Sequence, residues 1–278
     1  MSISACIEKS SRYNVSKNQC LQYASRPIRP SRMNTTIPSI LGRLLEELSW
    51  TGKQIVSYRG GGRGFENVLS TEVLQALYFL PRSEFLGAVI RAFHEGCAAT
   101  RAAFASEAEQ AEFLVLPGGG MYLQADNIPK VEVQPDAVIT TPNVYCLVEA
   151  KRIRSSSFQP RQLAREFLMA HHFAGDRRPM LALLLSGPPP VRVQGRGRLS
   201  IRDAIIGALP HVFCVGTDFS AWESRIEDTV CWLTWAELAE QIRQVQSALK
   251  FADPTIEAAI RRITTSVLKS IEWHDAVA

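Results

Sequence analysis

The chain has 278 residues, of which 46% are hydrophobic and 21% are charged, and its formal net charge is +4. This length can bury a hydrophobic core without disulfides or metals, and the composition excludes disordered, collagen-like and coiled-coil proteins. The longest purely apolar run, residues 180–185, is far shorter than the roughly 18 residues of a membrane helix. The first residues also lack an apolar stretch of signal-peptide length, so we expect a cytoplasmic protein without membrane contact.

The positive charge is concentrated in two segments. Residues 1–33 contain six basic side chains and one acidic side chain, and residues 151–202 contain eleven basic and two acidic side chains. A charge distribution of this kind can focus an anionic ligand onto one face of a protein. We therefore expect a polyanionic partner, with an ordinary solvated basic surface as the alternative that stays open.

The first part of the chain is predicted to be a disordered tail followed by helices. Residues 1–36 are rich in Ser, Asn and Arg and show no periodicity, which is typical of disorder. Apolar residues at helical spacing then predict four helices. The first lies at 41–48, the second ends at Pro81, and the other two lie at 84–95 and 100–111. A glycine-rich loop at 58–65 separates the first two helices.

From residue 112 onward the pattern changes to that of strands. Four segments are expected to form an antiparallel meander, at 112–116, 121–124, 131–139 and 144–150. Beyond them the sequence predicts a helix at 160–172, an apolar strand at 180–185, a basic loop at 187–198, and strands at 212–215 and 230–233. Helix-capping signals at Thr234 and Asp253 predict the last two helices.

This order of elements predicts an α/β domain with a mixed sheet. We expect a disordered basic tail at 1–36, a single domain at 37–250 and a C-terminal helix at 251–278.

Two of the predicted strands carry residue types suited to metal-dependent chemistry. Asp136 lies in the third strand, and Glu149-Ala150-Lys151 ends the fourth. Side chains two positions apart in a strand share a face, so Glu149 and Lys151 should point the same way. If the neighbouring strand brings Asp136 alongside, two carboxylates and an ammonium group converge. An all-oxygen site selects Mg²⁺ or Mn²⁺, and a lysine beside it can orient a water and stabilise negative charge in the transition state.

With Pro135-Asp136 and Glu149-Ala150-Lys151, the chain resembles the PD-(D/E)xK phosphodiesterase superfamily, over roughly residues 60–245. The resemblance implies a restriction-endonuclease-like fold, with a three-layer core in which helices flank a central mixed sheet, and extra N-terminal helices. It also implies Mg²⁺ or Mn²⁺ bound by Asp136, Glu149 and the Ala150 carbonyl, with Lys151 acting on the attacking water. The implied reaction is hydrolysis of DNA phosphodiester bonds in restriction, phage defence or DNA repair.

Family members also place an acidic residue on the helix before the sheet and a polar residue on the helix after the lysine. Glu66 and Glu72 are the candidates on the first helix, and Gln162 on the second. At about 100° per residue, Glu66 lies in line with Leu69 and Ser70, whereas Glu72 lies about 120° away from Glu66. We therefore expect Glu66 at the metal site, with a helix-capping role as its alternative. A solvent-facing side chain is the alternative for Gln162.

Basic residues near the motif are the expected contacts to nucleic acid, at Arg152, Arg154, Arg161, Arg165, Arg59 and Arg63. The last two lie in the glycine-rich loop before a helix start, where backbone amides can hold phosphate. Two other functions stay open: a catalytically inactive nuclease-like domain that binds nucleic acid or a partner protein, and a different α/β enzyme with a cation site. DNA is favoured over RNA only by the resemblance, and a homodimer or a targeting partner is open as well.

Overall fold

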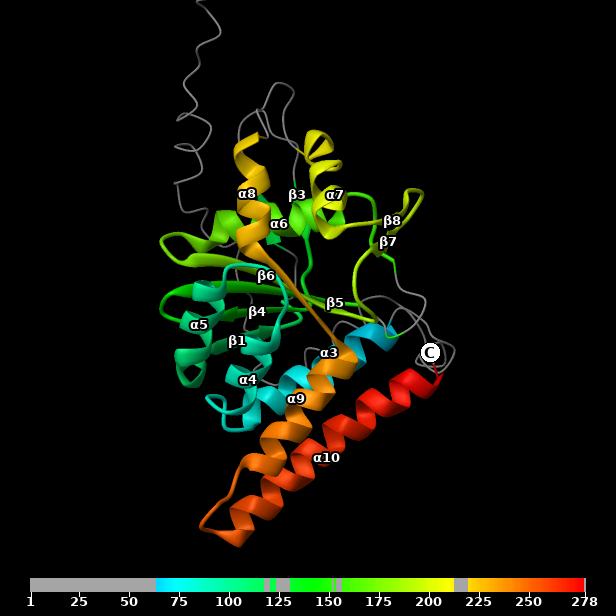
Figure 1. Ribbon diagram of the computed structural model, residues 1–278. Coiled ribbons are helices and arrows are strands. Elements are labelled where there is room, and N and C mark those ends of the chain that lie inside the picture. The colour runs from blue at the N-terminus through cyan, green and yellow to red at the C-terminus, as the bar shows by residue number, and fades with distance from the viewer. Residues whose placement is uncertain are drawn as a thin grey trace, which may run out of the picture.

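The computed structural model describes residues 64–117, 121–123, 131–151, 153, 157–212 and 220–277 (Figure 1). The predicted tail at 1–36, the helix at 41–48 and residues 58–63 of the glycine-rich loop, with Arg59 and Arg63, lie outside these residues, as do Arg152 and Arg154. The last two residues predicted for that loop, Gly64 and Phe65, begin a helix instead.

A five-stranded mixed sheet forms the centre of the protein. Its strands follow the order β1-β4-β5-β6-β9, with bounds Glu112–Val115, Ala137–Thr140, Val144–Ala150, Arg178–Leu185 and Val230–Thr234. The first three strands pair antiparallel and the last three pair parallel. Every residue of β5 is buried, as expected for a central strand that is covered on both faces. Helix α6 (Gln162–Ala174) makes the crossover between the parallel strands β5 and β6.

The predicted antiparallel meander is wrong in its pairing. β2 (Met121–Leu123) and β3 (Val131–Val133) form a separate hairpin, and β1 pairs with β4 instead. The predicted strand at 131–139 breaks after Val133, because Pro135 has no N–H for the ladder. The chain therefore enters the main sheet only after Asp136, whose backbone carbonyl accepts a hydrogen bond from the Leu116 N–H at 2.8 Å.

Helices precede the sheet in the chain, as predicted. They are α3 (Gly64–Phe79), α4 (Phe85–Ala92) and α5 (Ala98–Ser106), the last followed by a short 3₁₀ turn at Ala108–Gln110. α4 ends earlier than the predicted residue 95, because His94 pairs with Trp232 as an isolated β-bridge. Glu95 and Gly96 then adopt φ angles of 59° and 64°, which a helix cannot contain.

The C-terminal helices begin at their predicted caps. α9 (Trp235–Ala248) starts with a complete capping box between Thr234 and Glu237, and the Asp253 carboxylate caps α10 (Pro254–Val277). None of the helices in the described parts of the chain is long and apolar enough to cross a bilayer.

The segment predicted as a basic loop at 187–198 contains a hairpin, formed by β7 (Val191–Val193) and β8 (Gly197–Leu199). α7 (Ile201–Ile206) and a 3₁₀ turn at Leu209–His211 follow it, and α8 (Ser220–Thr229) precedes β9. The strand predicted at 212–215 does not begin where expected, since Val212 closes the 3₁₀ turn, and its other residues are outside the description.

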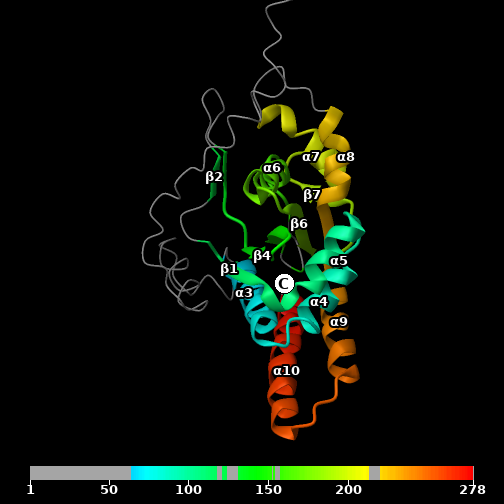
Figure 2. The same ribbon diagram turned by 90° about the vertical axis from the view of Figure 1, so that its left-hand side faces the viewer.

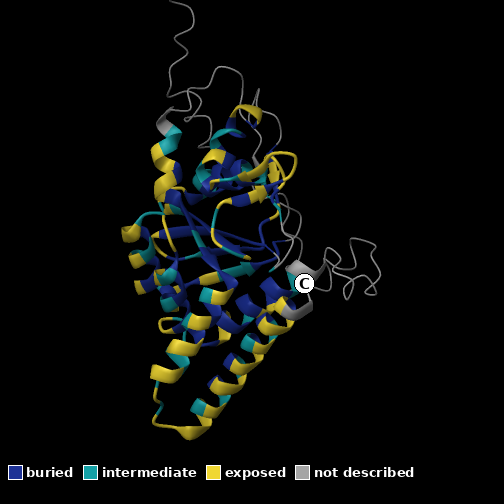
Figure 3. Cartoon of the chain, turned by 45° about the vertical axis from the view of Figure 1, so that its right-hand side comes forward, coloured by how far each residue is buried: buried dark blue, intermediate teal, exposed yellow. Residues whose placement is uncertain are grey.

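Hydrophobic residues pack into two clusters, one on each face of the sheet. One joins the sheet to α3, α4, α9 and α10, and the other joins it to α6 and α7 (Figures 1 and 2). β5 contributes side chains to both clusters, because Val148 and Ala150 face the first cluster while Tyr145 and Leu147 face the second. The buried residues accordingly fill the middle of the molecule in Figure 3.

Candidate active site

The Asp136 carboxylate lies beside the end of β5. Ala137 pairs with Val148, so the antiparallel register brings Asp136 next to Glu149 and Ala150. The Ala150 N–H donates to Asp136 Oδ2 at 2.7 Å, and Ser70 Oγ on α3 donates to Oδ1 at 3.2 Å. The Asp136 residue is only 7% exposed. Its carboxylate is therefore held on both oxygens, by one strand and one helix.

Glu149 and Lys151 meet on one face of β5, as the strand spacing predicts. Lys151 Nζ forms an ion pair with Glu149 Oε1 and lies 5.0 Å from the ring centroid of Phe158. The backbone of Lys151 continues the pairing with β6, because its N–H donates to the Leu184 carbonyl at 2.7 Å. The Trp235 Nε1–H donates to the Lys151 carbonyl at 2.6 Å, which fixes the strand end against α9.

Lys151 is buried together with its ion-pair partner Glu149. A lysine at an exposed sheet edge would contribute little to packing, but Lys151 is 7% exposed and its partner Glu149 is 3% exposed. Removing one member of a buried ion pair leaves an uncompensated charge in a low-dielectric environment. Lys151 thus stabilises the folded site in addition to any chemical role.

Gln162 also reaches the site, from the first turn of α6. Its Nε2 donates to Glu149 Oε1, and its Oε1 accepts a hydrogen bond from the Gln159 N–H at 3.3 Å. These two bonds fix the orientation of the amide. Gln162 is therefore a site residue, as expected, rather than a solvent-facing one.

Glu166 is a site residue that the sequence analysis missed. It lies four residues after Gln162, on the same face of α6, and is 2% exposed. Burial, followed by the negative charge of Glu149, raises the pKa of Glu166 well above its ordinary value. Within the described part of the chain, its Oε2 atom has no hydrogen-bond partner. The only sequence signal was an acidic residue four positions after the candidate Gln162.

The two acidic candidates on α3 differ in what the structure describes. Glu72 is exposed and accepts a hydrogen bond from Ser270 Oγ on α10, so it takes no part in this site. Glu66 lies in the first turn of α3, and its side chain is outside the described atoms. Ser70 belongs to the helix face assigned to Glu66, and it contacts Asp136. This contact supports the prediction that this face of α3 is directed toward the site.

Of the six arginines expected to contact nucleic acid, the structure describes two, and both lie near the start of α6. Arg161 occupies the N-cap position and is exposed, and Arg165 is half-buried one turn later. Both therefore lie close in sequence to Gln162, which contacts Glu149.

The donor atoms fit a hard divalent cation. Mg²⁺ is commonly held by one or two carboxylates together with water and substrate oxygens, and Asp136 and Glu149 supply two carboxylates from paired strands. A carboxylate oxygen that accepts a hydrogen bond keeps a further lone pair for a ligand bond. Among the described residues, no group of three His, Cys, Asp or Glu side chains is placed to hold a metal. Any further ligands in the described site would have to be backbone carbonyls, water or substrate.

Comparison of the chain with protein-family models, with curated proteins and with solved structures found no significant match. The functional argument therefore depends on the residues of the site and their geometry.

Proposed function

We propose that this protein is a Mg²⁺- or Mn²⁺-dependent nuclease of the PD-(D/E)xK type, which hydrolyses phosphodiester bonds of DNA. The observation that carries the proposal is the bond between the buried Asp136 carboxylate and the Ala150 N–H. It joins the aspartate of the motif to the strand end that bears Glu149 and Lys151. The aspartate and the strand end are distant in the sequence, and their contact supports the proposal.

The fold agrees with this proposal in its coarse features. Helices lie on both faces of the mixed sheet, and α3 precedes the first strand. We propose that these layers form a restriction-endonuclease-like core, with β4 and β5 as the strands that carry the site.

Each residue of the site has a proposed task. Asp136 and Glu149 would hold the cation, with the Ala150 carbonyl as a further ligand and Glu66 as a candidate from α3. When bound, the cation supplies a Lewis acid and lowers the pKa of a coordinated water. Lys151 would orient the attacking water and stabilise negative charge that develops on the phosphate oxygens.

The two polar residues of α6 have proposed positioning roles. Gln162 donates to the same Glu149 oxygen that Lys151 contacts, so it fixes the carboxylate of Glu149 from the helix side. Glu166 lies against Glu149 and is in contact with Gln162. Residues that orient metal ligands typically change metal affinity or activity 10–100-fold when they are replaced.

The charge distribution favours a nucleic acid as substrate. Residues 151–202 begin at Lys151 and carry eleven basic and two acidic side chains. Neutralising phosphates with such residues supplies most of the sequence-independent binding free energy. We propose that Arg161 and Arg165 contribute to phosphate binding beside the site.

Incubation of the purified full chain with linear, circular and single-stranded DNA and with RNA, in Mg²⁺, Mn²⁺ or chelator, tests the proposal. We expect DNA cleavage with either metal and none with chelator. Lys151→Gln should eliminate it. Glu72→Gln is the matched control, because this acidic residue contacts Ser270 away from the site, and should cleave like the wild type. Binding of DNA without cleavage under every metal condition would instead favour the inactive nuclease-like domain.

A further inference from the structure

The β7–β8 hairpin has one apolar and one basic face. Its register pairs Val191 with Leu199, Arg192 with Arg198, and Val193 with Gly197. Val191 and Val193 are buried in the hydrophobic cluster beneath α6, and Arg192 and Arg198 are exposed. Since successive side chains of a strand point to opposite faces, the two arginines stand directly opposite each other on the outer face.

The arginines of the hairpin form no ion pair with any carboxylate among the residues that the structure describes. Like charges directly opposite in a strand pair are destabilising. In the described part of the chain, no carboxylate forms an ion pair with Arg192, Arg198 or Arg196. Arg202, a few residues later, instead pairs with Glu223 and Glu227 of α8. The hairpin therefore concentrates uncompensated positive charge that a bound polyanion would neutralise.

The turn of the hairpin carries a third arginine, Arg196, whose guanidinium group lies against Gly207 at the C-cap of α7. The Arg196 N–H donates to the Val193 carbonyl at 3.1 Å and closes the turn. Gly195 and Gly197 adopt φ angles of 71° and 79°, which favour glycine. No atom lies within 4 Å of a Cβ built at either glycine, so the tip is open on that side. The tip can thus approach the surface of a large ligand.

The hairpin is fixed close to the candidate active site. The Phe158 N–H donates to the Arg192 carbonyl and the Gln194 N–H donates to the Phe158 carbonyl, both at 2.9 Å. The same Phe158 is buried, and its ring contacts Lys151 Nζ at 5.0 Å. β7 is therefore attached to the segment that leads from Lys151 into α6 (Figure 1).

We infer that the β7–β8 hairpin binds the sugar-phosphate backbone of duplex DNA through Arg192 and Arg198. Guanidinium groups match the geometry of phosphate oxygens, and a two-stranded ribbon fits the dimensions of a duplex groove. The choice of DNA rests on the proposed function, but the binding itself does not require cleavage. The hairpin would hold the duplex while the scissile phosphate occupies the site at Asp136, Glu149 and Lys151.

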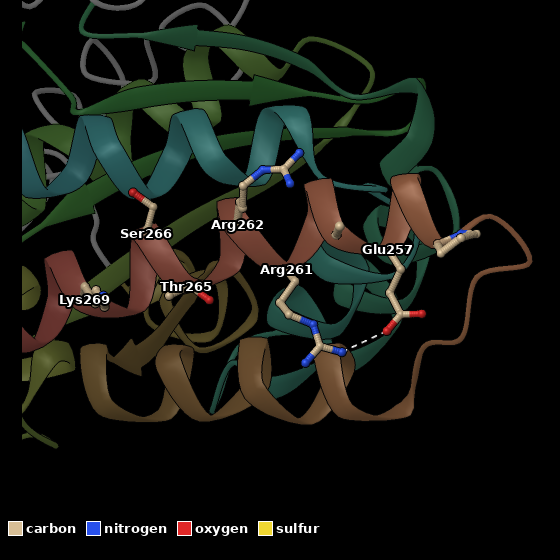
Figure 4. Close-up of a pocket in the computed structure, with 8 residues that line it drawn as sticks. Glu257, Arg261, Arg262, Thr265, Ser266 and Lys269 are labelled. Atoms are coloured by element: carbon tan, nitrogen blue, oxygen red, sulfur yellow. Dashed lines mark hydrogen bonds and ion pairs between the residues drawn. The ribbon is translucent and has the colours of Figure 1, made fainter.

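A second basic surface of the protein provides a matched control. Arg261 and Arg262 lie on α10 with Thr265, Ser266 and Lys269, along a shallow depression (Figure 4). Arg261 is neutralised by Glu257 at 2.8 Å. In Figure 1 the first half of α10, which begins at Pro254, lies at the end of the molecule away from the hairpin. Replacing two arginines there changes the net charge as much as replacing two in the hairpin.

The test is the affinity of the full chain for a fluorescently labelled DNA duplex, measured by anisotropy in chelator over a salt series. We expect the double variant, Arg192→Gln with Arg198→Gln, to weaken binding about 10-fold at low salt. The slope of the logarithm of the binding constant against the logarithm of the salt concentration should decrease in magnitude by about 2. Arg261→Gln with Arg262→Gln should change the affinity less than about 2-fold. The thermal melting temperature of the hairpin variant should not fall, because the substitution removes a like-charge pair.

Equal duplex affinity of the hairpin variant and the wild type, or no duplex binding by the wild type, would overturn the inference. Parallel titrations with single-stranded DNA and with duplex RNA test the choice of ligand. A loss confined to either of these would contradict the assignment to duplex DNA. Because the measurement is made without metal, failure of the hairpin to bind is distinguishable from failure of the protein to cleave.

Discussion

Asp136 Oδ2 accepts a hydrogen bond from the Ala150 N–H at 2.7 Å, so the carboxylate of the candidate site also joins the two strands that carry it. Ser70 holds the other oxygen from α3. Structural and proposed chemical roles therefore overlap at Asp136, and variants must be chosen to separate them.

Asp136→Ala should be less stable than Asp136→Asn. The alanine leaves the buried Ala150 N–H without its acceptor, at a cost of about 1–3 kcal/mol, whereas Ser70 Oγ still has the Asn67 carbonyl at 3.3 Å. The asparagine keeps one carbonyl oxygen as an acceptor. Urea unfolding of both variants measures the difference in free energy of unfolding. Equal stabilities would mean that the carboxylate does not join the strands in solution.

Lys151→Ala should lose both cleavage and stability. The substitution leaves Glu149 as a buried carboxylate without its ammonium partner, which typically costs 3–5 kcal/mol, so we expect a loss of about that size. A double variant, Glu149→Gln with Lys151→Met, removes the whole pair and should recover much of the stability while remaining inactive. Chemical denaturation and cleavage assays on the same preparations check this. A fully stable Lys151→Ala would contradict the buried ion pair.

Ser70→Ala should weaken the site without unfolding the protein. The hydroxyl donates to Asp136 Oδ1 and is fully buried, so its loss removes the hydrogen bond that α3 makes to this oxygen. By analogy with other residues that orient metal ligands, we expect a 10–100-fold increase in the metal concentration needed for half-maximal cleavage. Mg²⁺ titration of the cleavage rate gives this value. An unchanged titration curve, beside Glu72→Gln as the control on the same helix, would show that Ser70 does not position Asp136.

Glu166 should make the stability of the metal-free protein depend on pH. Its pKa in the folded state is raised above the ordinary value of 4.5, so the folded protein binds a proton that the unfolded chain releases. This proton uptake contributes to the free energy of unfolding below the ordinary pKa of Glu166, and the contribution is lost as the pH rises through the folded-state pKa. Glu166→Gln removes this dependence.

Thermal melts in chelator between about pH 5 and about pH 8 measure this effect. The difference in melting temperature between Glu166→Gln and the wild type should increase toward higher pH. Glu112→Gln, which changes an exposed acidic residue of β1, should show no such trend. A constant difference for Glu166→Gln across the range would show that Glu166 is not a buried carboxyl with a raised pKa.

Local patterns were sufficient to predict much of this fold. The apolar run at 180–185 became the buried strand β6, and the caps at Thr234 and Asp253 start helices where expected. The spacing of Glu149 and Lys151 correctly placed both side chains on one face, because strand periodicity is a local property.

Features that depend on distant contacts were not predictable in the same way. The pairing of β1 with β4 depends on where the chain returns after β3, which periodicity does not encode. Glu166 was overlooked because acidic residues on helices usually face solvent, and only the packing of α6 on β5 buries this one. The β7–β8 hairpin was hidden by its Gly and Arg content, which resembles that of a solvated loop.

The most direct test of the account is a time course of plasmid cleavage by the wild type and by Asp136→Asn at increasing Mg²⁺ concentrations. We expect metal-dependent cleavage by the wild type, complete inhibition by chelator, and no cleavage by the folded variant. Cleavage that persists in Asp136→Asn, or that continues in chelator, would contradict a metal-dependent site built on Asp136.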